Sequence, residues 1–366
     1  MGGLTTSRER VPAAAWDALR TDAVRYGSAL AGFHNVNYML PEAAGHAQLL
    51  GVAAGTPVKV RLARKGLKVV ERSWADEGAI LRALDRTAAV SNTPRYYGGS
   101  DGISVHEYVA GTALSELCPP GKPLDPIHLD SIVGQLALFT EVSATDLPPL
   151  PAGWVPDGDS RAFLKARADF AEREVRAANW ADYGDLFTAL EIPANALRVL
   201  RDRRPPLRSR PFALLHGDLH RHNMIARPDG ELTIVDWELA MWGDPLHDLA
   251  IHLVRMRYPA DQRWEVVERW RVAVRPEFSV GLERDLPEYV NYERAQSLFA
   301  DTLRAAHGLA DVPAPGAVGA AVSRIRNALH LAAGPLRLSR VPSRTEVERA
   351  LLRWVRGRRS RRALAA

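Results

Sequence analysis

Apolar and polar residues alternate in short runs through the first third of the chain. Between residues 56 and 66, valine and leucine fall on one face of an extended segment, whereas Lys59 and Arg61 fall on the other. We expect strands in three stretches, the first and last of which turn at glycine: residues 28–40, 56–66 and 93–109. Helices are expected over residues 13–26 and 73–87, and Ser73 can cap the second.

After Gly111 the spacing of the apolar residues becomes helical. Helices are expected at residues 125–142, 160–190, 192–203, 245–256, 260–273, 287–306, 316–332 and 343–356. One hairpin is expected among them, because the extended runs MIA and ELTIVD flank the turn sequence RPDG at residues 227–230. We place the lobe boundary near residues 107–111, with a strand-rich lobe at 1–107 and a mainly helical lobe at 108–352.

The composition is that of a well-packed chain without disulfides. Apolar residues make up 46% and charged residues 25% of the 366 residues, and Cys118 is the single cysteine. No stretch approaches the ~18 consecutive apolar residues that a membrane span needs, and the first twenty residues lack a secretory signal. We therefore expect a cytoplasmic protein without a membrane partner.

The positive net charge belongs to the end of the chain. Six arginines lie between residue 353 and the C-terminus, and removing them from the net charge of +5 leaves −1 for the rest. We predict a basic, flexible tail at residues 353–366, and we favour a solvated tail over a contact with nucleic acid. The sequence makes no prediction about oligomeric state.

Residues 214–245, LLHGDLHRHNMIARPDGELTIVDWELAMWGDP, gather most of the side chains that could carry chemistry. Three histidines crowd the first part of this stretch. A structural zinc site would usually add cysteines, and a zinc protease would use an H-E-x-x-H helix, and neither pattern is present around them. If residues 216–223 form a loop, the three imidazoles need not converge, so we set zinc aside.

Phosphoryl transfer accounts for more of these residues. It needs a carboxylate that accepts the proton of the attacking hydroxyl, and oxygen ligands that hold Mg²⁺ on the phosphates. Asp218 and Asn223 lie five residues apart on a segment that enters the predicted hairpin, and Asp236 ends its second strand. Pairing of the two strands would bring Asn223 and Asp236 together. One neutral and one charged oxygen suit a divalent ion that bridges phosphates.

The motif HGDLHRHN followed by IVDWE resembles the aminoglycoside phosphotransferase and choline kinase family in order and spacing. The resemblance implies an α+β, bilobal, protein-kinase-like fold with a small β-rich N-terminal lobe and a larger, mainly helical C-terminal lobe. It implies that Asp218 is the catalytic base and that Asn223 and Asp236 are Mg²⁺ ligands. Asp244 and Asp248, in the next helix start, are expected to cap that helix or brace the catalytic loop.

The resemblance also assigns nucleotide contacts in the N-terminal lobe. The family places a cation on the third strand and pairs it with a helix carboxylate; Arg61 and Glu77, sixteen residues apart, match this pair, and Lys59 is the rival cation. Backbone groups of a phosphate-covering turn and of the inter-lobe linker are expected to bind phosphate and adenine. These residues are Gly32, Phe33, His34 and Asn35 in the turn, and Glu107 and Val109 in the linker.

Together these residues predict an enzyme that uses ATP, or GTP, and Mg²⁺ to phosphorylate a hydroxyl group of a small molecule. An antibiotic is the favoured acceptor, as for a resistance or self-protection kinase. The alternatives are a choline-, sugar- or amino-alcohol-type metabolite kinase, and a catalytically silent protein that binds nucleotide. A polycationic aminoglycoside would need an acidic pocket, for which the helical lobe offers four acids interleaved with arginine: Asp182, Asp185, Glu288 and Glu293.

Overall fold

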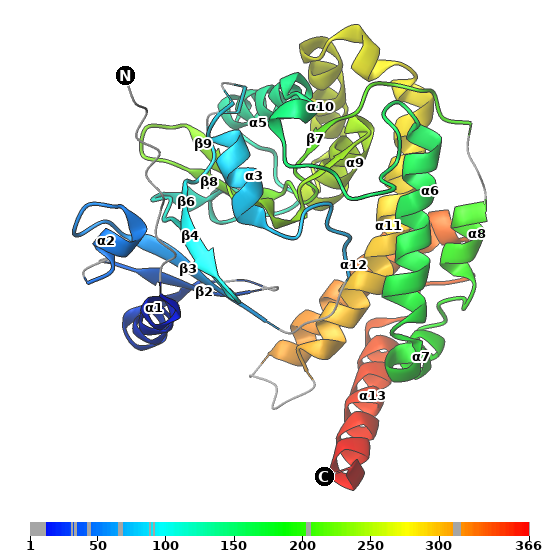
Figure 1. Cartoon of the computed structure of the whole chain (residues 1–366). Helices are drawn as coiled ribbons and strands as arrows, with labels where there is room; N and C mark the ends of the chain where they lie inside the picture. The colour runs from blue at the N-terminus through cyan, green and yellow to red at the C-terminus, as the bar shows by residue number, and fades with distance from the viewer. Residues whose placement is uncertain are drawn as a thin grey trace.

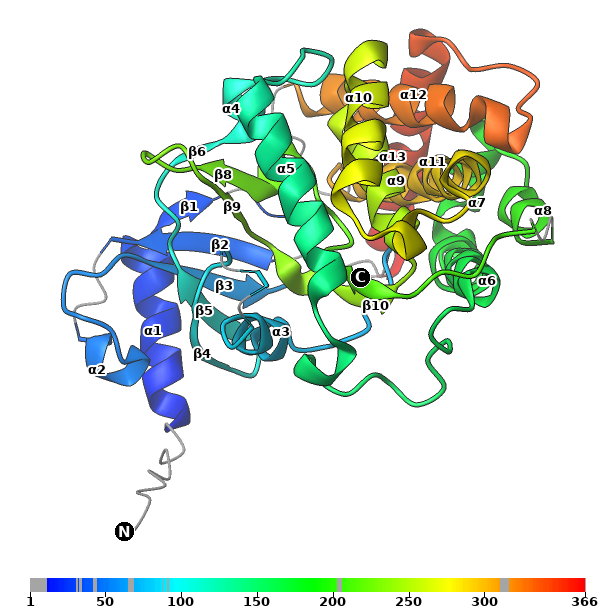
Figure 2. The same ribbon diagram turned by 90° about the horizontal axis from the view of Figure 1, so that it is seen from above.

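The computed structural model shows a chain folded into two lobes. The described residues are 12–30, 32, 35–41, 45–64, 69–87, 89–90, 92–202, 206–309 and 316–365, with the backbone alone for 361–365. A small antiparallel sheet with its helices lies beside a larger helical lobe in both views (Figure 1 and Figure 2). The predicted bilobal α+β architecture is confirmed.

The N-terminal sheet has five antiparallel strands in the spatial order β1-β2-β3-β5-β4. The elements of this lobe are α1 Ala13–Tyr26, β1 Ser28–Leu30, β2 Asn35–Leu40, α2 Ala47–Leu50, β3 Val58–Ala63, α3 Glu77–Leu84, β4 Tyr96–Ser100 and β5 Ile103–Glu107. Alternation along β3 turns Val58 and Val60 toward α1, with which they form a small apolar core. Arg61 points to the opposite face and contacts α3. The strands predicted in this lobe are confirmed.

Helix α3 begins at Glu77, four residues later than the sequence pattern predicted. Asp76, rather than Ser73, caps it: its carboxylate accepts a hydrogen bond from the Gly78 amide at 2.8 Å. Ser73 is instead buried in the segment before the helix, beside Trp74. The later start places Glu77 in the first turn, where the helix dipole favours a negative charge.

Helices build most of the C-terminal lobe, and their predicted positions are confirmed with shifted ends. They are α4 Leu114–Leu117, α5 Pro126–Leu138, α6 Ser160–Phe170, α7 Trp180–Ala189, α8 Ala196–Asp202, α9 Pro245–Met256, α10 Ala260–Ala273, α11 Leu282–His307, α12 Ala317–Leu336 and α13 Arg344–Ala365. A π-helical turn at Ala171–Ala177 divides the helix predicted over 160–190. The long helix α11 packs against both α9 and α12 (Figure 1). Within the described ranges, no helix has the length and apolar character needed to cross a membrane.

Two small sheets lie in the C-terminal lobe. One joins β6 Thr112–Ala113, β8 Met224–Ala226 and β9 Leu232–Ile234; the other joins β7 Ala213–Leu215 and β10 Met241–Gly243. The predicted hairpin is confirmed, because β8 and β9 pair antiparallel with Met224 opposite Ile234. Asn223 directly precedes β8, and Asp236 follows β9 by two residues, so the two side chains are carried at adjoining strand ends.

A fully buried ion cluster anchors the start of α9. The guanidinium of Arg210 donates to Asp244 at 2.6 Å and also bonds Asp285. Asp244 caps α9 by accepting from the Leu246 amide at 3.0 Å, and it accepts from the Tyr289 hydroxyl at 2.7 Å. The structural role expected for Asp244 is confirmed. Leaving one partner of such a buried pair alone costs about 3–5 kcal/mol, so the position of α9 is firmly set.

The chain from residue 353 onward differs from the flexible tail that its charge predicted. It continues α13 to Ala365, and in this part of the helix Trp354 and Val355 pack into the lobe. Trp354 stacks on Tyr183 with ring centroids 4.9 Å apart, and its indole N–H donates to the Asp182 carbonyl at 2.8 Å. The arginines alternate with these apolar positions, so a count of charges did not detect the buried stripe.

Replacing Trp354 with alanine tests this docking. Trp354 is 5% exposed, so Trp354→Ala should lower the free energy of unfolding by about 3–5 kcal/mol, the usual cost of removing a buried tryptophan. Leu352 lies on the same helix but is 37% exposed, and Leu352→Ala should cost far less. Urea denaturation of the two variants compares them; equal, small losses would mean that the helix does not dock in solution.

Candidate active site

A cavity of about 850 Å³ lies between the two lobes. Most of the residues singled out in the sequence line it: Gly32, Asn35, Arg61, Glu77, Glu107, Val109, Asp218, Asn223 and Asp236. Phe33 and His34 lie outside the described residues. The structure thus brings together side chains from the N-terminal sheet, α3, the linker and the hairpin, which are far apart in the sequence.

The loop that carries Asp218, residues 216–223, follows β7. Side chains of α9 form hydrogen bonds with its backbone. The carboxylate of Asp248 accepts hydrogen bonds from the amides of His216 and Gly217, each at 2.9 Å. Gly217 has φ +77°, and a Cβ atom there would lie 2.3 Å from the Leu239 carbonyl oxygen, so only glycine fits. The bracing role expected for Asp248 is confirmed. Burial raises the pKa of Asp248 to about 6, against the effect of the two amides.

Two more buried side chains hold the same loop. The ring of His252, on α9, bonds the Leu219 carbonyl at 3.1 Å and the Tyr258 hydroxyl at 2.9 Å. Arg221 donates to three backbone carbonyls, those of Met256, Cys118 and Lys122. The loop is therefore tied to the lobe on both sides of Asp218, which limits how far the Asp218 carboxylate can move.

His216 is a structural residue of this loop. Its Nδ1 accepts a hydrogen bond from the Asp218 amide at 3.2 Å, and its Nε2 donates to the Val235 carbonyl at 3.1 Å. Burial lowers the pKa of His216 to about 4, so the ring is neutral at pH 7. Its contacts are with backbone rather than with His220 and His222. Among the described residues, no group of three or more His, Cys, Asp or Glu side chains has the arrangement of a metal site.

Asp218 lies in a positive environment. Burial alone would raise its pKa, but His220, whose Nε2 is 3.3 Å from the carboxylate, together with Arg255 and Arg304, holds the pKa well below its usual range. Asp218 is therefore ionised at neutral pH. His220 was weighed only as a zinc ligand, although its place two residues after Asp218 lets the loop fold it back onto the carboxylate.

Asn223 and Asp236 offer oxygen atoms to the same cavity. The side-chain amide of Asn223 donates to the Asp218 carbonyl at 2.9 Å, which leaves its Oδ1 without a protein partner among the described residues. Asp236 adopts a left-handed backbone conformation, with φ 69° and ψ 61°, which is rare for a residue other than glycine. Its carboxylate is 34% exposed, and Arg61 bonds one of its oxygens at 2.8 Å. Burial would raise the pKa of Asp236, but the charges of Arg61 and Lys59 lower it.

Arg61 contacts three carboxylates on the N-terminal side of the cavity. Its guanidinium pairs with Glu77, as the family resemblance implied, and it also bonds Asp236 and, at 3.2 Å, Glu238. The other oxygen of Glu77 accepts from the Trp237 amide at 2.9 Å. Arg61 is 4% exposed, so this cation is held almost out of water by carboxylates of both lobes.

Glu238 is a cavity residue that the sequence reasoning missed. Besides Arg61, it accepts hydrogen bonds from Arg72 at 2.9 Å and from Asn35 at 3.1 Å. Burial and the charge of Asp236 raise the pKa of Glu238 to about 7. Its position two residues after Asp236, across a tight turn, was the available signal. Glu238 adds a second carboxylate beside Asp236.

Comparisons with known proteins agree with this geometry. The model of the phosphotransferase enzyme family matches residues 49–290. An ethanolamine kinase from Plasmodium vivax has a TM-score of 0.57 at 12% identity, over 84% of this chain and 81% of its own. The choline kinase LicA from Streptococcus pneumoniae has a TM-score of 0.50 at 15% identity, over 87% of this chain and 98% of its own. No curated protein gives a significant sequence match.

A further solved structure is a thermostable mutant of the aminoglycoside phosphotransferase APH(4)-Ia, in a ternary complex with ADP and hygromycin B. It has a TM-score of 0.52 at 15% identity, over 89% of this chain and 99% of its own. At such low identity these structures show the fold alone. The protein-kinase-like fold that the sequence motif implied is confirmed.

His252, which holds the loop that carries Asp218, predicts how the stability of the protein depends on pH. Burial lowers the pKa of His252 from 6.5 to about 4, so folding favours the neutral ring and wild-type stability falls as pH drops from about 6.5 toward about 4. His252→Gln removes that dependence. The variant should be less stable than wild type at pH 7, and the deficit should shrink by roughly 2 kcal/mol at pH 5. His330 is exposed, and His330→Gln makes the same chemical change there and serves as the control. Urea denaturation at the two pH values measures both; a constant deficit for His252→Gln would contradict the neutral buried ring.

Proposed function

The chain belongs to the phosphotransferase enzyme family, and on that premise we propose that it transfers the γ-phosphoryl group of ATP, with Mg²⁺, to a hydroxyl group of a small molecule. One observation carries the proposal. An ionised carboxylate, Asp218, lines the same cavity as the oxygen donors Asn223 and Asp236 and the buried pair of Arg61 and Glu77. These are the groups that phosphoryl transfer needs.

Asp218 is proposed to receive the acceptor hydroxyl. As an anion it accepts the hydrogen bond of that hydroxyl and points the oxygen at the phosphoryl group. Its lowered pKa makes it a weak base in the ground state, so the proton moves to it as the new P–O bond forms, the bond to the leaving ADP oxygen breaks and the hydroxyl becomes acidic. The braces from α9 keep this carboxylate in place while the acceptor binds.

The residues around Asp236 fit Mg²⁺. Asn223 Oδ1 and one oxygen of Asp236 have no protein partner among the described residues, and both are hard oxygen donors of the kind that Mg²⁺ selects. When bound, Mg²⁺ would neutralise charge on the phosphate oxygens of the nucleotide. Glu238 lies beside these two residues and adds negative charge that favours a divalent cation.

The nucleotide is proposed to lie against the N-terminal sheet. Arg61 would contact its phosphates, with Glu77 fixing the guanidinium, and the backbone amides of Gly32 and Asn35 would cover them. A Cβ atom at Gly32 would lie 2.8 Å from the Asn35 carbonyl oxygen and 2.2 Å from Asn37 Nδ2, so glycine suits this position. The Glu107 amide already bonds the Arg95 carbonyl at 2.8 Å. The adenine contacts proposed for the linker therefore fall to the Glu107 carbonyl and to the Val109 backbone.

For the acceptor we propose a small hydroxylated molecule, with an antibiotic as the first class to test. Support comes from the size of the cavity, about 850 Å³, which exceeds the needs of a nucleotide's triphosphate end alone. The similar structures include kinases of ethanolamine, choline and an aminoglycoside. This fold therefore serves acceptors of both kinds, and the choice between antibiotic and metabolite rests on the side chains of this chain.

Replacement of Asp218 by asparagine tests the proposal. Asp218→Asn should lower turnover about 10²–10⁴-fold while nucleotide affinity stays close to wild type, because the carboxylate serves the acceptor rather than ATP. ADP formation and binding of a fluorescent ATP analogue measure the two effects. Asp229→Asn makes the same chemical change in the exposed hairpin turn and should leave both unchanged. Wild-type turnover in Asp218→Asn would remove Asp218 from the mechanism.

A second pair of variants tests the cation of β3. Arg61→Lys keeps the charge, but one ammonium cannot serve Glu77 and Asp236 together. The loss of one charge-assisted contact, about 1.5–3 kcal/mol, should raise the Michaelis constant for ATP roughly tenfold or more. Lys59 lies on the same strand face, and Lys59→Met should change the constant much less. The reverse ranking would give the phosphate contact to Lys59.

A further inference from the structure

None of the four acids that could have formed an acidic acceptor pocket offers an open carboxylate to the cavity. Asp182 and Asp185 are exposed on α7 and are absent from the cavity lining. Glu288 lines a separate cavity between α6, α8 and α11. A polycationic acceptor would therefore find none of these charges beside Asp218.

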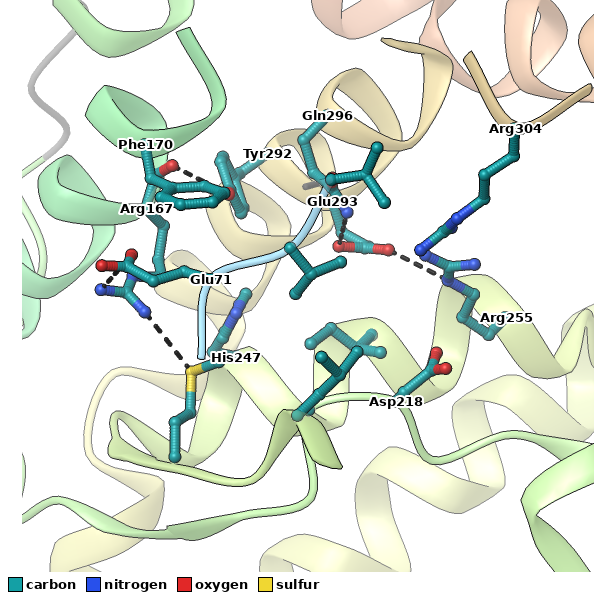
Figure 3. Close-up of a pocket in the computed structure, with 16 residues that line it drawn as sticks. Glu71, Arg167, Phe170, Asp218, His247, Arg255, Tyr292, Glu293, Gln296 and Arg304 are labelled. Carbon is teal, nitrogen blue, oxygen red and sulfur yellow. Dashed lines mark hydrogen bonds and ion pairs between the residues drawn. The ribbon is translucent and has the colours of Figure 1, made fainter. Parts of the chain in front are cut away.

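Glu293, the fourth acid, is already fully engaged. It is 2% exposed, and its carboxylate accepts hydrogen bonds from Arg255 at 3.2 Å, Gln296 at 2.7 Å and Ser297 at 2.9 Å. Figure 3 shows the carboxylate of Glu293, on α11, turned toward the guanidinium of Arg255, on α9. Its charge thus serves to hold Arg255 and is not available to a ligand.

The C-lobe helices instead present arginines to the cavity. Arg255 from α9, Arg257 directly after it, Arg304 from α11 and Arg324 from α12 line it, whereas Asp301 is the single acid that these three helices add to the lining. Asp301 lies 3.5 Å from Arg304. This wall of the cavity carries an excess of positive charge.

Arg255 and Arg304 lie close enough to repel each other. Figure 3 shows their guanidinium groups converging on the side of Asp218 that faces α11. Burial lowers the pKa of Arg304, and the charge of Arg255 is the next largest cause. Arg324 acts on Arg304 in the same direction. Like charges held together in a partly buried wall are costly, and an anion placed between them would offset that cost.

Two of these arginines also line a space that the proposed metal ligands do not. This second, small cavity of about 30 Å³ is lined by Asp218, Arg255 and Arg304, but by neither Asn223 nor Asp236. A group bound to Arg304 would therefore lie near Asp218.

We infer that the acceptor carries an anionic group, a carboxylate or a phosphate, which binds to Arg304 and Arg324 while its hydroxyl lies against Asp218. The inference rests on the proposed phosphotransferase function and narrows its substrate class. Guanidinium groups bind carboxylate and phosphate with paired, charge-assisted hydrogen bonds, and their planar shape selects such groups. Within the antibiotic class, the wall favours a hydroxylated acid over a polyamine.

The first experiment measures binding to the full chain saturated with AMP-PNP and Mg²⁺, so that the nucleotide phosphate site is occupied. Three probes of similar size and different charge are compared: D-gluconate, D-glucose and D-glucosamine. Glycerol 3-phosphate and glycerol form a second set, which distinguishes phosphate from carboxylate. We expect each anion to bind at least about tenfold more tightly than its neutral partner. Equal affinities across the charge series would overturn the inference.

Binding of the anionic probes must also depend on the arginines that line this side of the cavity. Arg324→Gln should remove most of the preference for the anion, whereas Arg349→Gln, the same change on the exposed face of α13, should leave it intact. Identical anion affinity in Arg324→Gln and wild type would place the anion elsewhere and overturn the assignment.

Phosphoryl transfer to the same probes separates this inference from the function on which it rests. Faster ADP formation with D-glucosamine or a polyamine antibiotic than with the anions would confirm a kinase and overturn the anionic acceptor. Arg324-dependent anion binding without ADP formation from any probe or antibiotic would count against the kinase and leave the anion site standing. Transfer to an anionic probe that falls at least about tenfold in kcat/KM in Arg324→Gln would support both.

Discussion

Arg61 is the residue on which the geometry of the cavity depends. A guanidinium at 4% exposure is tolerable only when carboxylates surround it, and its partners come from both lobes: Glu77 from α3, and Asp236 and Glu238 from the turn after β9. One cation therefore fixes the distance between the sheet and the hairpin that carries Asp236. Apolar packing adds to this charge pairing, because Leu81 and Leu84 of α3 belong to the same buried core as Trp237. A second cation also joins the two lobes here, because Arg72, in the segment before α3, bonds Glu238.

The other half of the site depends on the buried polar groups of α9. Arg210 and Asp244 fix the start of this helix, and one turn later Asp248 accepts the two amides that precede Asp218. Another turn on, His252 holds the Leu219 carbonyl. Three polar residues at helical spacing thus connect the core of the lobe to the loop, and an apolar replacement at any of them would leave backbone groups unpaired. Precise placement of Asp218 follows from this helix more than from the loop itself.

The sequence predicted the parts of the site that are local or that a motif links. The hairpin with Asn223 and Asp236 followed from two short runs around RPDG, and the pairing of Arg61 with Glu77 was implied by the family resemblance and agreed with their spacing. His220 and Glu238 were missed, because their contacts depend on how a tight turn bends and leave no period in the sequence. The arginine wall was also beyond reach, because Arg255, Arg304 and Arg324 come from three helices whose facing sides are set by tertiary packing. The end of α13 was misjudged for a related reason: six arginines suggested a tail, whereas Trp354 decides where the helix lies.

Carboxylates gather around Arg61 on one side of the cavity, and arginines of the C-lobe helices line another side. Burial, and after it the charge of Asp236, raises the pKa of Glu238 to about 7, a cost that a bound cation would offset. On the arginine side the excess charge is positive, and the same arginines help to lower the pKa of Asp218. An anion bound to that wall would neutralise part of the positive charge and let the pKa of Asp218 rise toward its usual range. Binding of the proposed acceptor would therefore strengthen the base that serves it. On the proposed binding mode, recognition of the acceptor and the proton affinity of Asp218 would be coupled through Arg304.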